Sequence, residues 1–264
     1  MRRRRRSFPD SYGAWAVVAG SSEGFGAAFA AELAARGMNL MLLARRGDVL
    51  AEVRDRLQST HPVEVRCVEL DLADDAYAAA LADAAAGLDI GIVVYNAASV
   101  PIGPFLSNTD EAIQHAVDVN VRGPLRAVQT LAPAMCERGR GAVVLVSSLS
   151  GLQGTPHVAV YAATKAFNTH LAESLWYELR PFGIDVVACC AGAMPTPGYA
   201  RTFGRDVPGM LAPEEAARQT LDRLDRGPRV VPGRVNRLAA QLMGRAVSRK
   251  AAIRFIARDT KHLT

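Results

Sequence analysis

The chain has 264 residues, half of them apolar, and a formal net charge of +5. This length suits one α/β domain, since such domains routinely run to about 200–250 residues, and the apolar fraction is ample for a packed core. No apolar run reaches the ~18 residues that a membrane-spanning helix needs, which argues against a transmembrane protein.

The chain opens with five arginines at positions 2–6. We expect residues 1–11 to form a basic, solvated and partly disordered tail, although such a charge run can also meet an anionic partner. No apolar segment of the length that a signal peptide requires follows the arginines. Four cysteines, at positions 67, 136, 189 and 190, lack metal-ligand spacing. They indicate core thiols in a reducing compartment, and we expect a cytoplasmic protein without a metal site.

A glycine-rich turn follows the first predicted strand, residues 14–19, and precedes an alanine-rich helix over residues 27–36. Gly20, Gly24 and Gly26 would let the backbone approach a pyrophosphate closely. The N-terminus of the helix would offer unpaired N–H groups and the positive end of its dipole. Glycine also marks ordinary turns, so this pattern alone is weak evidence of a dinucleotide site.

Strands and helices alternate along the whole chain without internal repeats. Strands are predicted at residues 14–19, 39–43, 63–70, 91–95, 142–146, 184–190 and 229–231. Helices fill the intervals, so we predict an α/β fold with a doubly wound parallel sheet of about seven strands, in one domain over residues 12–233. A glycine- and proline-rich loop follows the sixth strand, over residues 195–209, and is predicted to be a substrate lid.

Two arginines, Arg45 and Arg46, follow the second predicted strand. An NAD enzyme would present a carboxylate to the ribose 2′-hydroxyl here, whereas a guanidinium suits the 2′-phosphate of NADP. Arginine is also common at exposed strand ends, and Glu23 is a poor neighbour for a phosphate. We expect NADP(H) to be preferred over NAD(H).

Tyr161 and Lys165 stand four residues apart, thirteen residues after Ser148. At this spacing both side chains leave the same face of a helix. A free phenol has a pKa near ~10, and a nearby ammonium would lower it by favouring the phenolate. Ser148 follows a predicted buried strand, whose C-terminal end is where open parallel sheets bind ligands. The three residues therefore indicate a site of proton transfer.

These features occur with further short motifs, in order: AGSSEGFG (19–26), DL (71–72), NAA (96–98), Asn120 within DVNVRG, SS (147–148), YAATK (161–165) and AGAMPT (191–196). With them, residues 12–233 resemble the short-chain dehydrogenase/reductase superfamily, in its form with a single Rossmann domain. The likeness is to reductases of 3-oxoacyl chains and to 17β-hydroxysteroid dehydrogenases. Three positions depart from the family pattern: Ala19 for threonine, Ala98 for glycine and Ala191 for proline.

The resemblance implies a catalytic set of Asn120, Ser148, Tyr161 and Lys165. Tyr161 would exchange a proton with the substrate oxygen that Ser148 holds, Lys165 would lower the pKa of Tyr161 and bind the nicotinamide ribose, and Asn120 would hold a water. The resemblance and the residue patterns together predict cofactor contacts from Gly20, Ser22, Gly24, Phe25, Gly26, Arg45, Arg46, Asp71, Leu72, Asn96, Ala97, Tyr161, Lys165 and Thr196. The resemblance also implies a homodimer or homotetramer, paired through the helices that carry Asn120 and Tyr161.

The predicted substrate is a small hydrophobic ketone or secondary alcohol, such as an acyl chain or a steroid-like ring system. The residues expected near it are mostly apolar: Leu149, Leu152, Gln153, Met194, Phe203 and Met210. Binding pockets are predominantly apolar in general. Two alternatives stay open: a non-catalytic NADP-binding regulator on the same fold, and a membrane-surface interaction protein.

Residues 234–264 are predicted to form a basic amphipathic helical extension. Leu238, Leu242, Ala246, Ile253 and Ile256 recur near helical spacing, and residues 226–264 hold ten basic residues against one acidic residue. Such a helix can lie in a membrane interface, or it can dock on the core or on another subunit. We expect peripheral contact with membranes to be one use of this segment and expect no nucleic-acid partner.

Overall fold

The computed structural model describes residues 7–204, 209–245 and 248–263. Within these residues, seven strands form a single sheet in which every neighbouring pair is parallel, in the order β3-β2-β1-β4-β5-β6-β7. The strands are β1 (Trp15–Ala19), β2 (Asn39–Ala44), β3 (Val65–Glu69), β4 (Ile90–Tyr95), β5 (Gly141–Ser148), β6 (Ile184–Ala191) and β7 (Arg229–Val230). This confirms the predicted single-domain, doubly wound parallel sheet.

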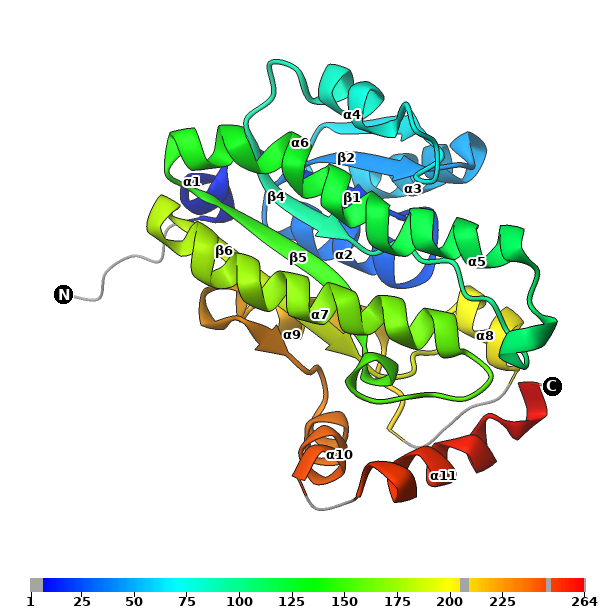
Figure 1. Cartoon of the computed structure of the whole chain (residues 1–264). Coiled ribbons are helices and arrows are strands. Elements are labelled where there is room, and N and C mark those ends of the chain that lie inside the picture. The colour runs from blue at the N-terminus through cyan, green and yellow to red at the C-terminus, as the bar shows by residue number, and fades with distance from the viewer. Residues whose placement is uncertain (1–6, 205–208, 246–247, 264) are drawn as a thin grey trace.

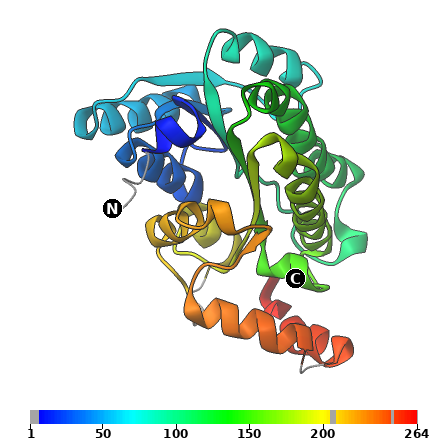
Figure 2. The ribbon, with the colours of Figure 1, turned by 90° about the vertical axis from the view of Figure 1, so that its left-hand side faces the viewer.

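Helices cover both faces of the sheet (Figure 2). The described α-helices are α1 (Phe8–Tyr12), α2 (Gly24–Ala35), α3 (Gly47–Thr60), α4 (Tyr77–Ala85), α5 (Asp110–Val117), α6 (Gly123–Arg138), α7 (Ala159–Leu179), α8 (Pro197–Phe203), α9 (Pro213–Leu221), α10 (Arg234–Arg245) and α11 (Arg249–Asp259). Side chains of α2, α3 and α9 pack on one face, and those of α4, α6 and α7 pack on the other. The central strands are therefore buried on both sides, which explains their continuous apolar sequences.

The strand β1 shows how one run of residues serves two cores. Ala16 and Val18 join the cluster under α2, whereas Trp15, Val17 and Ala19 join the cluster on the opposite face. Successive side chains of a strand point to opposite faces, so a strand between two helical layers needs apolar residues at every position.

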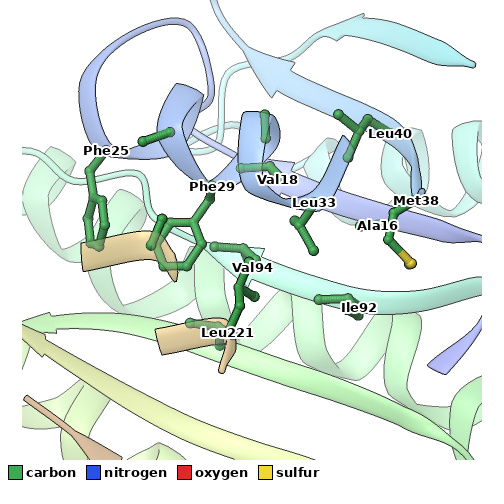
Figure 3. Close-up of a cluster of buried hydrophobic side chains, with 14 of the residues drawn as sticks. Ala16, Val18, Phe25, Phe29, Leu33, Met38, Leu40, Ile92, Val94 and Leu221 are labelled. Atoms are coloured by element: carbon green, nitrogen blue, oxygen red, sulfur yellow. The ribbon is translucent and has the colours of Figure 1, made fainter. Parts of the chain in front are cut away.

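The first of these cores anchors the helix that follows the glycine turn. Phe25 and Phe29 of α2 pack with ring centroids 4.5 Å apart. In Figure 3 the Phe29 ring lies near Val94 of the sheet, and both rings belong to the cluster that also includes Leu221 of α9. Because these rings are buried, the beginning of α2 is held firmly against the sheet. The helix begins at Gly24, three residues before the predicted start.

The strand order reverses direction between β1 and β4, so the segments that leave these two strands separate to opposite faces. This switch point opens a crevice at the C-terminal edge of an α/β sheet, where such folds bind ligands. In this chain the glycine turn follows β1 and the NAA motif follows β4. The topology thus places two predicted cofactor segments on either side of one crevice.

The predicted disordered tail is wrong for residues 8–11, which belong to α1; residues 1–6 lie outside the described residues. Phe8 and Tyr12 are one helical turn apart, and their rings meet edge to face at 5.3 Å. The Arg36 guanidinium lies 4.5 Å from the centroid of the Phe8 ring, and the Tyr12 hydroxyl donates to Asp185 at 3.1 Å. These contacts with the domain order the segment.

The C-terminal extension is helical, as predicted, but it forms two helices, α10 and α11, that lie beyond the β7 edge of the sheet (Figure 1). Ser248 caps the second helix, because its side chain accepts from the Ala251 N–H at 3.3 Å. Of the predicted apolar stripe, Leu238 and Leu242 are exposed, and Ile253 and Ile256 are half-buried; Ala246 lies outside the described residues. None of the described helices has the length and hydropathy needed to cross a membrane.

Candidate active site

The helix α7 and the end of β5 bring together three of the four predicted catalytic residues. Ser148 is the last residue of β5, and its Oγ accepts from the Ser150 N–H at 3.1 Å, which caps the 3-10 helix η3 (Leu149–Leu152). The Ser148 hydroxyl also lies close enough to the Tyr161 phenol to favour its ionised form. One helical turn below, the Lys165 Nζ lies 5.6 Å from the centroid of the Tyr161 ring.

Burial controls the acidity of Tyr161. It raises the pKa of this phenol, and the interaction with Ser148 only partly opposes the rise. The expected lowering of this pKa by Lys165 is not found, since burial has the largest influence on the phenol. The Lys165 Nζ instead donates to the Val146 carbonyl oxygen at 2.7 Å. Tyr161 is therefore protonated at neutral pH, in the form that can donate a proton.

Lys165 is buried, with 2% of its surface exposed, and loss of hydration lowers its pKa to about 8. Burial disfavours the charged form of an amine, and the acceptor at Val146 is a neutral carbonyl. The ammonium therefore exchanges its proton far more readily near neutral pH than an exposed lysine would.

We expect this lowered pKa to appear as pH-dependent stability. Between pH 8 and about 10.4, the unfolded chain binds more protons at this lysine than the folded chain does, so the lysine's contribution to stability rises with pH. Relative to Lys165→Met, the wild type should gain about 2 kcal/mol of unfolding free energy from pH 8 to pH 10. Urea unfolding of both proteins at the two pH values measures this. A constant difference between them would contradict a depressed pKa.

Asn120 lies in the π-helical turn Asp118–Arg122, between α5 and α6, and is buried. Its Oδ1 accepts from the Ser99 N–H at 2.7 Å, and its Nδ2 donates to the Ser99 carbonyl at 2.8 Å and to Thr164 Oγ1 at 3.0 Å. Asn120 thus ties the segment after β4 to the residue that precedes Lys165. Single π-helical turns of this kind are frequent at functional sites. The predicted water-holding role stays a prediction.

The glycine turn is packed too closely to accept side chains. Gly20 has φ +79°, and a Cβ there would lie 2.7 Å from the backbone of Ala97. A Cβ at Gly26 would lie 1.9 Å from the Gly20 carbonyl oxygen. The Asn96 Nδ2 donates to the same oxygen at 2.9 Å, so Asn96 braces the turn.

The start of α2 fits the pyrophosphate of a dinucleotide. Among the described residues, no side chain caps this helix, and its first turn presents the N–H groups of Gly24, Phe25 and Gly26. These unpaired donors and the positive end of the helix dipole favour an anion. Because the Phe25 ring packs against Phe29, this residue can offer a ligand only its backbone. The glycines leave the space that such a ligand needs.

Arg46 belongs to an ionic junction beside the glycine turn. Its Nη2 lies 3.2 Å from both Ser22 Oγ and Glu23 Oε2, and Arg201 of α8 contacts the other Glu23 oxygen. Burial opposes ionisation of Glu23, but the hydrogen bonds from Arg201 and Arg46 hold its pKa below the usual range. Arg45 is exposed and, within the described part of the chain, has no carboxylate partner. Arg45 is thus available to an incoming phosphate.

The other predicted cofactor residues lie partly at the surface and partly in the core. Asp71 is exposed, and its Oδ1 accepts from the Ala73 N–H at 3.0 Å, whereas Leu72 is buried in the core. Thr196 caps α8 by accepting from the Tyr199 N–H at 3.1 Å. A Cβ at Gly24 would lie 3.1 Å from Thr196 Cβ, so the predicted lid begins beside the glycine turn. Residues 205–208 of this lid lie outside the described residues.

Sequence reasoning missed several polar groups that position the site. Ser147 Oγ donates to the Lys165 carbonyl oxygen at 2.6 Å and bonds Thr169 Oγ1 at 2.7 Å. Arg201 and Thr164 were also missed, because only the tertiary fold pairs them with Glu23 and Asn120. His157, set aside as a loop residue, has φ +64°, and its buried Nδ1 has no partner among the described residues.

The C-terminal segment packs against the loops expected to hold substrate. Arg249 Nη1 of α11 donates to the Leu152 carbonyl oxygen at 3.3 Å. The Ile253 side chain lies 3.6 Å from the position that a Cβ of Gly154 would occupy. Ala252 and Leu263 are buried. At these residues the extension is docked on the domain.

Comparison with known proteins agrees with this geometry. The family model for short chain dehydrogenases matches residues 14–205. The very-long-chain 3-oxoacyl-CoA reductase of Pyricularia oryzae is 37% identical over 181 residues, which make up 66% of this chain and 54% of that protein. This chain therefore matches only about half the length of that reductase. The 7β-hydroxysteroid dehydrogenase of Clostridium sardiniense is 30% identical over 234 residues, or 88% of this chain and 90% of that protein.

Solved structures extend the likeness into the C-terminal region. The structure of a 7β-hydroxysteroid dehydrogenase superposes with a TM-score of 0.90 at 27% identity, covering 96% of this chain and 100% of that one. A short-chain dehydrogenase from Sphingobium yanoikuyae in complex with NADPH gives a TM-score of 0.76 at 31% identity, covering 82% and 86%. The chain therefore belongs to the short-chain dehydrogenase family of oxidoreductases.

Proposed function

We propose that this protein is an NADP(H)-dependent oxidoreductase that interconverts a hydrophobic ketone and its secondary alcohol. One observation carries the proposal: Ser148 and the phenol of Tyr161 interact beside buried Lys165 at the C-terminal edge of the sheet. A regulator that only bound a nucleotide would have no use for a phenol, a hydroxyl and an amine arranged for proton transfer. This consideration disfavours the non-catalytic alternative.

The roles of the side chains follow from their chemistry. In reduction, the Ser148 hydroxyl donates a hydrogen bond to the substrate carbonyl oxygen, and Tyr161 donates its proton to that oxygen as the alcohol forms. A bound nicotinamide supplies the hydride in reduction and accepts it in oxidation. Lys165, with its pKa near 8, is suited to exchange a proton with solvent during the cycle. Because burial raises the pKa of Tyr161, the protein's resting form is the proton donor, which favours reduction at neutral pH.

Preference for NADP over NAD is supported by charge at the end of β2. Arg45 is exposed and lacks a carboxylate partner among the described residues, and Arg46 lies one residue further on, against Ser22. A guanidinium fork matches the geometry of a phosphate group. The relative from Sphingobium yanoikuyae binds NADPH, which is consistent with this assignment.

A hydrophobic substrate is supported by the segments beside Ser148 and Tyr161. Leu149 and Leu152 lie in the 3-10 helix that follows Ser148, and Met194 is buried in the segment after β6. Such apolar walls favour an acyl chain or a fused ring system over a sugar or an organic acid. The two curated relatives act on a very-long-chain 3-oxoacyl-CoA and on a hydroxysteroid, and both substrates carry large apolar bodies.

A paired substrate screen tests the proposed function. Apolar ketones of two kinds, a steroid ketone series and a 3-oxoacyl thioester series, are offered with NADPH and separately with NADH, and oxidation of the nicotinamide is followed by absorbance. We expect turnover in at least one series, faster with NADPH. The Tyr161→Phe protein serves as the control for contaminating reductases. If neither series turned over with either nucleotide, the proposed activity would be wrong.

We further propose a homodimer or homotetramer that contacts anionic membranes peripherally, with the cytoplasm as its compartment. On α10, Val235, Leu238 and Leu242 are exposed at 62%, 58% and 50%, and they recur at helical spacing. Phe255 of α11 is 61% exposed. Exposed apolar side chains among arginines suit the boundary between lipid headgroups and acyl chains. Several copies in an oligomer would raise the avidity of a contact that is weak per copy.

We expect Leu238→Gln/Leu242→Gln to weaken sedimentation with phosphatidylserine vesicles at least several-fold at low salt. The double variant removes apolar contact but keeps α11 docked and the charge unchanged. Added salt should weaken the wild-type interaction too, since exposed charges are screened over ~10 Å at 0.1 M. Leu106→Gln, at a side chain that is 94% exposed elsewhere, is the matched control. Equal sedimentation by wild type and double variant would exclude this face as the membrane contact.

A further inference from the structure

A cavity of about 610 Å³ lies beside the free edge of the sheet, between β7 and α10. In Figure 1, α10 lies beyond this edge, away from α4. The cavity is lined by Leu152, Arg223, Arg226, Arg229, Val230, Val231, Arg237, Ala240 and Gln241. We propose that this cavity is a binding site for a phosphate-bearing ligand, separate from the glycine turn that would hold the cofactor.

The charges in the cavity are only partly balanced by the protein. Arg229 Nε lies 2.9 Å from Glu173 Oε1, and Arg226 Nε lies 3.9 Å from Asp225 Oδ1. The other two guanidiniums, at Arg223 and Arg237, are half-buried and have no carboxylate partner among the described residues. None of the described lining residues is acidic. Two positive charges therefore face the cavity without a counter-charge.

The chemistry of these groups selects a phosphate dianion. A guanidinium presents a planar fork of N–H donors that matches two phosphate oxygens, and each such hydrogen bond is strengthened by charge. Two uncompensated guanidiniums match the charge of a phosphate monoester, about −1.5 to −2 at neutral pH. Arg237 Nη1 is 3.4 Å from the Val231 carbonyl oxygen, a long contact that leaves most of its donors free.

The rest of the cavity suits the organic body of such a ligand. Leu152, Val230, Val231 and Ala240 form apolar walls, and Gln241 adds a neutral hydrogen-bonding group. The volume falls within the ~300–1,000 Å³ typical of small-molecule sites and exceeds the space that one phosphate ion fills. Apolar walls also lower the local dielectric, which strengthens the attraction between guanidinium and phosphate.

The cavity reaches toward the catalytic residues through Leu152. This residue ends the 3-10 helix that begins directly after Ser148, and its carbonyl accepts from Arg249 of α11. A ligand in the cavity would therefore contact the segment that holds Ser148 in place. The phosphate can come from two sources, a free phosphorylated metabolite or a phosphate carried by the substrate itself, and both present the same group to Arg223 and Arg237.

Calorimetric titration of the full chain with inorganic phosphate and with pyrophosphate tests the site directly. We expect Arg223→Gln/Arg237→Gln to weaken phosphate binding at least tenfold, and Arg223→Lys/Arg237→Lys to restore part of it. The control Arg54→Gln/Arg56→Gln removes the same charge from α3, at half-buried Arg54 and exposed Arg56, neither of which lines the cavity, and should bind as the wild type does. NADP affinity, measured in parallel, should be unchanged in the cavity variants, which separates the cavity from the glycine turn.

Equal phosphate affinity in the wild type and the cavity variant, or no phosphate binding by the wild type, would overturn the proposal. The restored binding of the lysine variant guards against loss of fold as the cause of an effect.

A kinetic comparison then distinguishes the two sources, and this arm alone rests on the proposed function. The KM of the wild type and of Arg223→Gln/Arg237→Gln is measured with two substrates, a 3-oxoacyl-CoA, which carries phosphates, and a phosphate-free ketone. If the cavity binds a phosphate of the substrate, the variant should have a higher KM only for the 3-oxoacyl-CoA. A free phosphorylated ligand predicts unchanged KM for both substrates. Either result assigns the source of the phosphate, whereas the titration stands even if neither substrate is turned over.

Discussion

Tyr161→Phe should lower turnover by ~10²–10⁴ while leaving the fold and nucleotide affinity intact, because the change removes only the hydroxyl that transfers the proton. The hydroxyl interacts with Ser148, and the Tyr161 ring on α7 has its centroid 5.6 Å from the Lys165 Nζ. Loss of this proton donor should therefore reduce kcat and kcat/KM together, since the interaction matters in the transition state. Steady-state kinetics and a fluorescence titration with NADPH measure the two quantities.

Tyr177→Phe provides the matched control for this substitution. Tyr177 lies on the same helix and is 76% exposed, so removal of its hydroxyl should change neither turnover nor stability. The turnover of Ser148→Ala should lie between that of Tyr161→Phe and that of Tyr177→Phe, because this change removes a hydrogen bond to the substrate oxygen but keeps the proton donor. Normal turnover by the Tyr161→Phe protein would show that another group donates the proton and that the assigned mechanism is wrong.

The sheet was predictable because its strands are buried on both faces. Runs such as residues 142–146 and 186–190 are apolar at every position, which is the pattern of a central parallel strand. The short-range motifs were equally informative, since a four-residue spacing on α7 fixes Tyr161 and Lys165 on one face. Local pattern therefore sufficed for the fold and for the residues that lie close in sequence.

Interactions between distant segments were not predictable from the sequence. Arg201 meets Glu23 across 178 residues, and Asn120 meets Thr164 across 44. No periodicity or motif links such pairs, and their geometry depends on how α8 and α7 pack against the sheet. The acidity of Tyr161 was mispredicted for the same reason, because the spacing reveals that Lys165 is near but not that a carbonyl oxygen accepts its hydrogen bond or that burial dominates.

Charge at the end of β2 should decide which nucleotide the enzyme prefers. Arg45→Asp should weaken NADP binding by ~10- to 100-fold, which corresponds to the loss of a charge-assisted hydrogen bond worth about 1.5–3 kcal/mol and to repulsion of the 2′-phosphate. NAD has no phosphate at this position, so its affinity should change much less. The ratio of the two affinities, measured by titration with each nucleotide, is the informative quantity.

Arg46 provides a comparison for Arg45, because the Arg46 guanidinium already has a carboxylate partner within the protein. Arg46 lies 3.2 Å from Glu23 Oε2, so a phosphate would have to compete with a carboxylate for it, whereas Arg45 has no such competitor among the described residues. Arg45→Asp should therefore change the ratio more than Arg46→Asp does. Arg56→Asp, an equal charge change at an exposed position on α3, controls for the general field and should leave the ratio unaltered. An NADP-to-NAD ratio that stayed at the wild-type value in Arg45→Asp would reject Arg45 as the residue that recognises the 2′-phosphate.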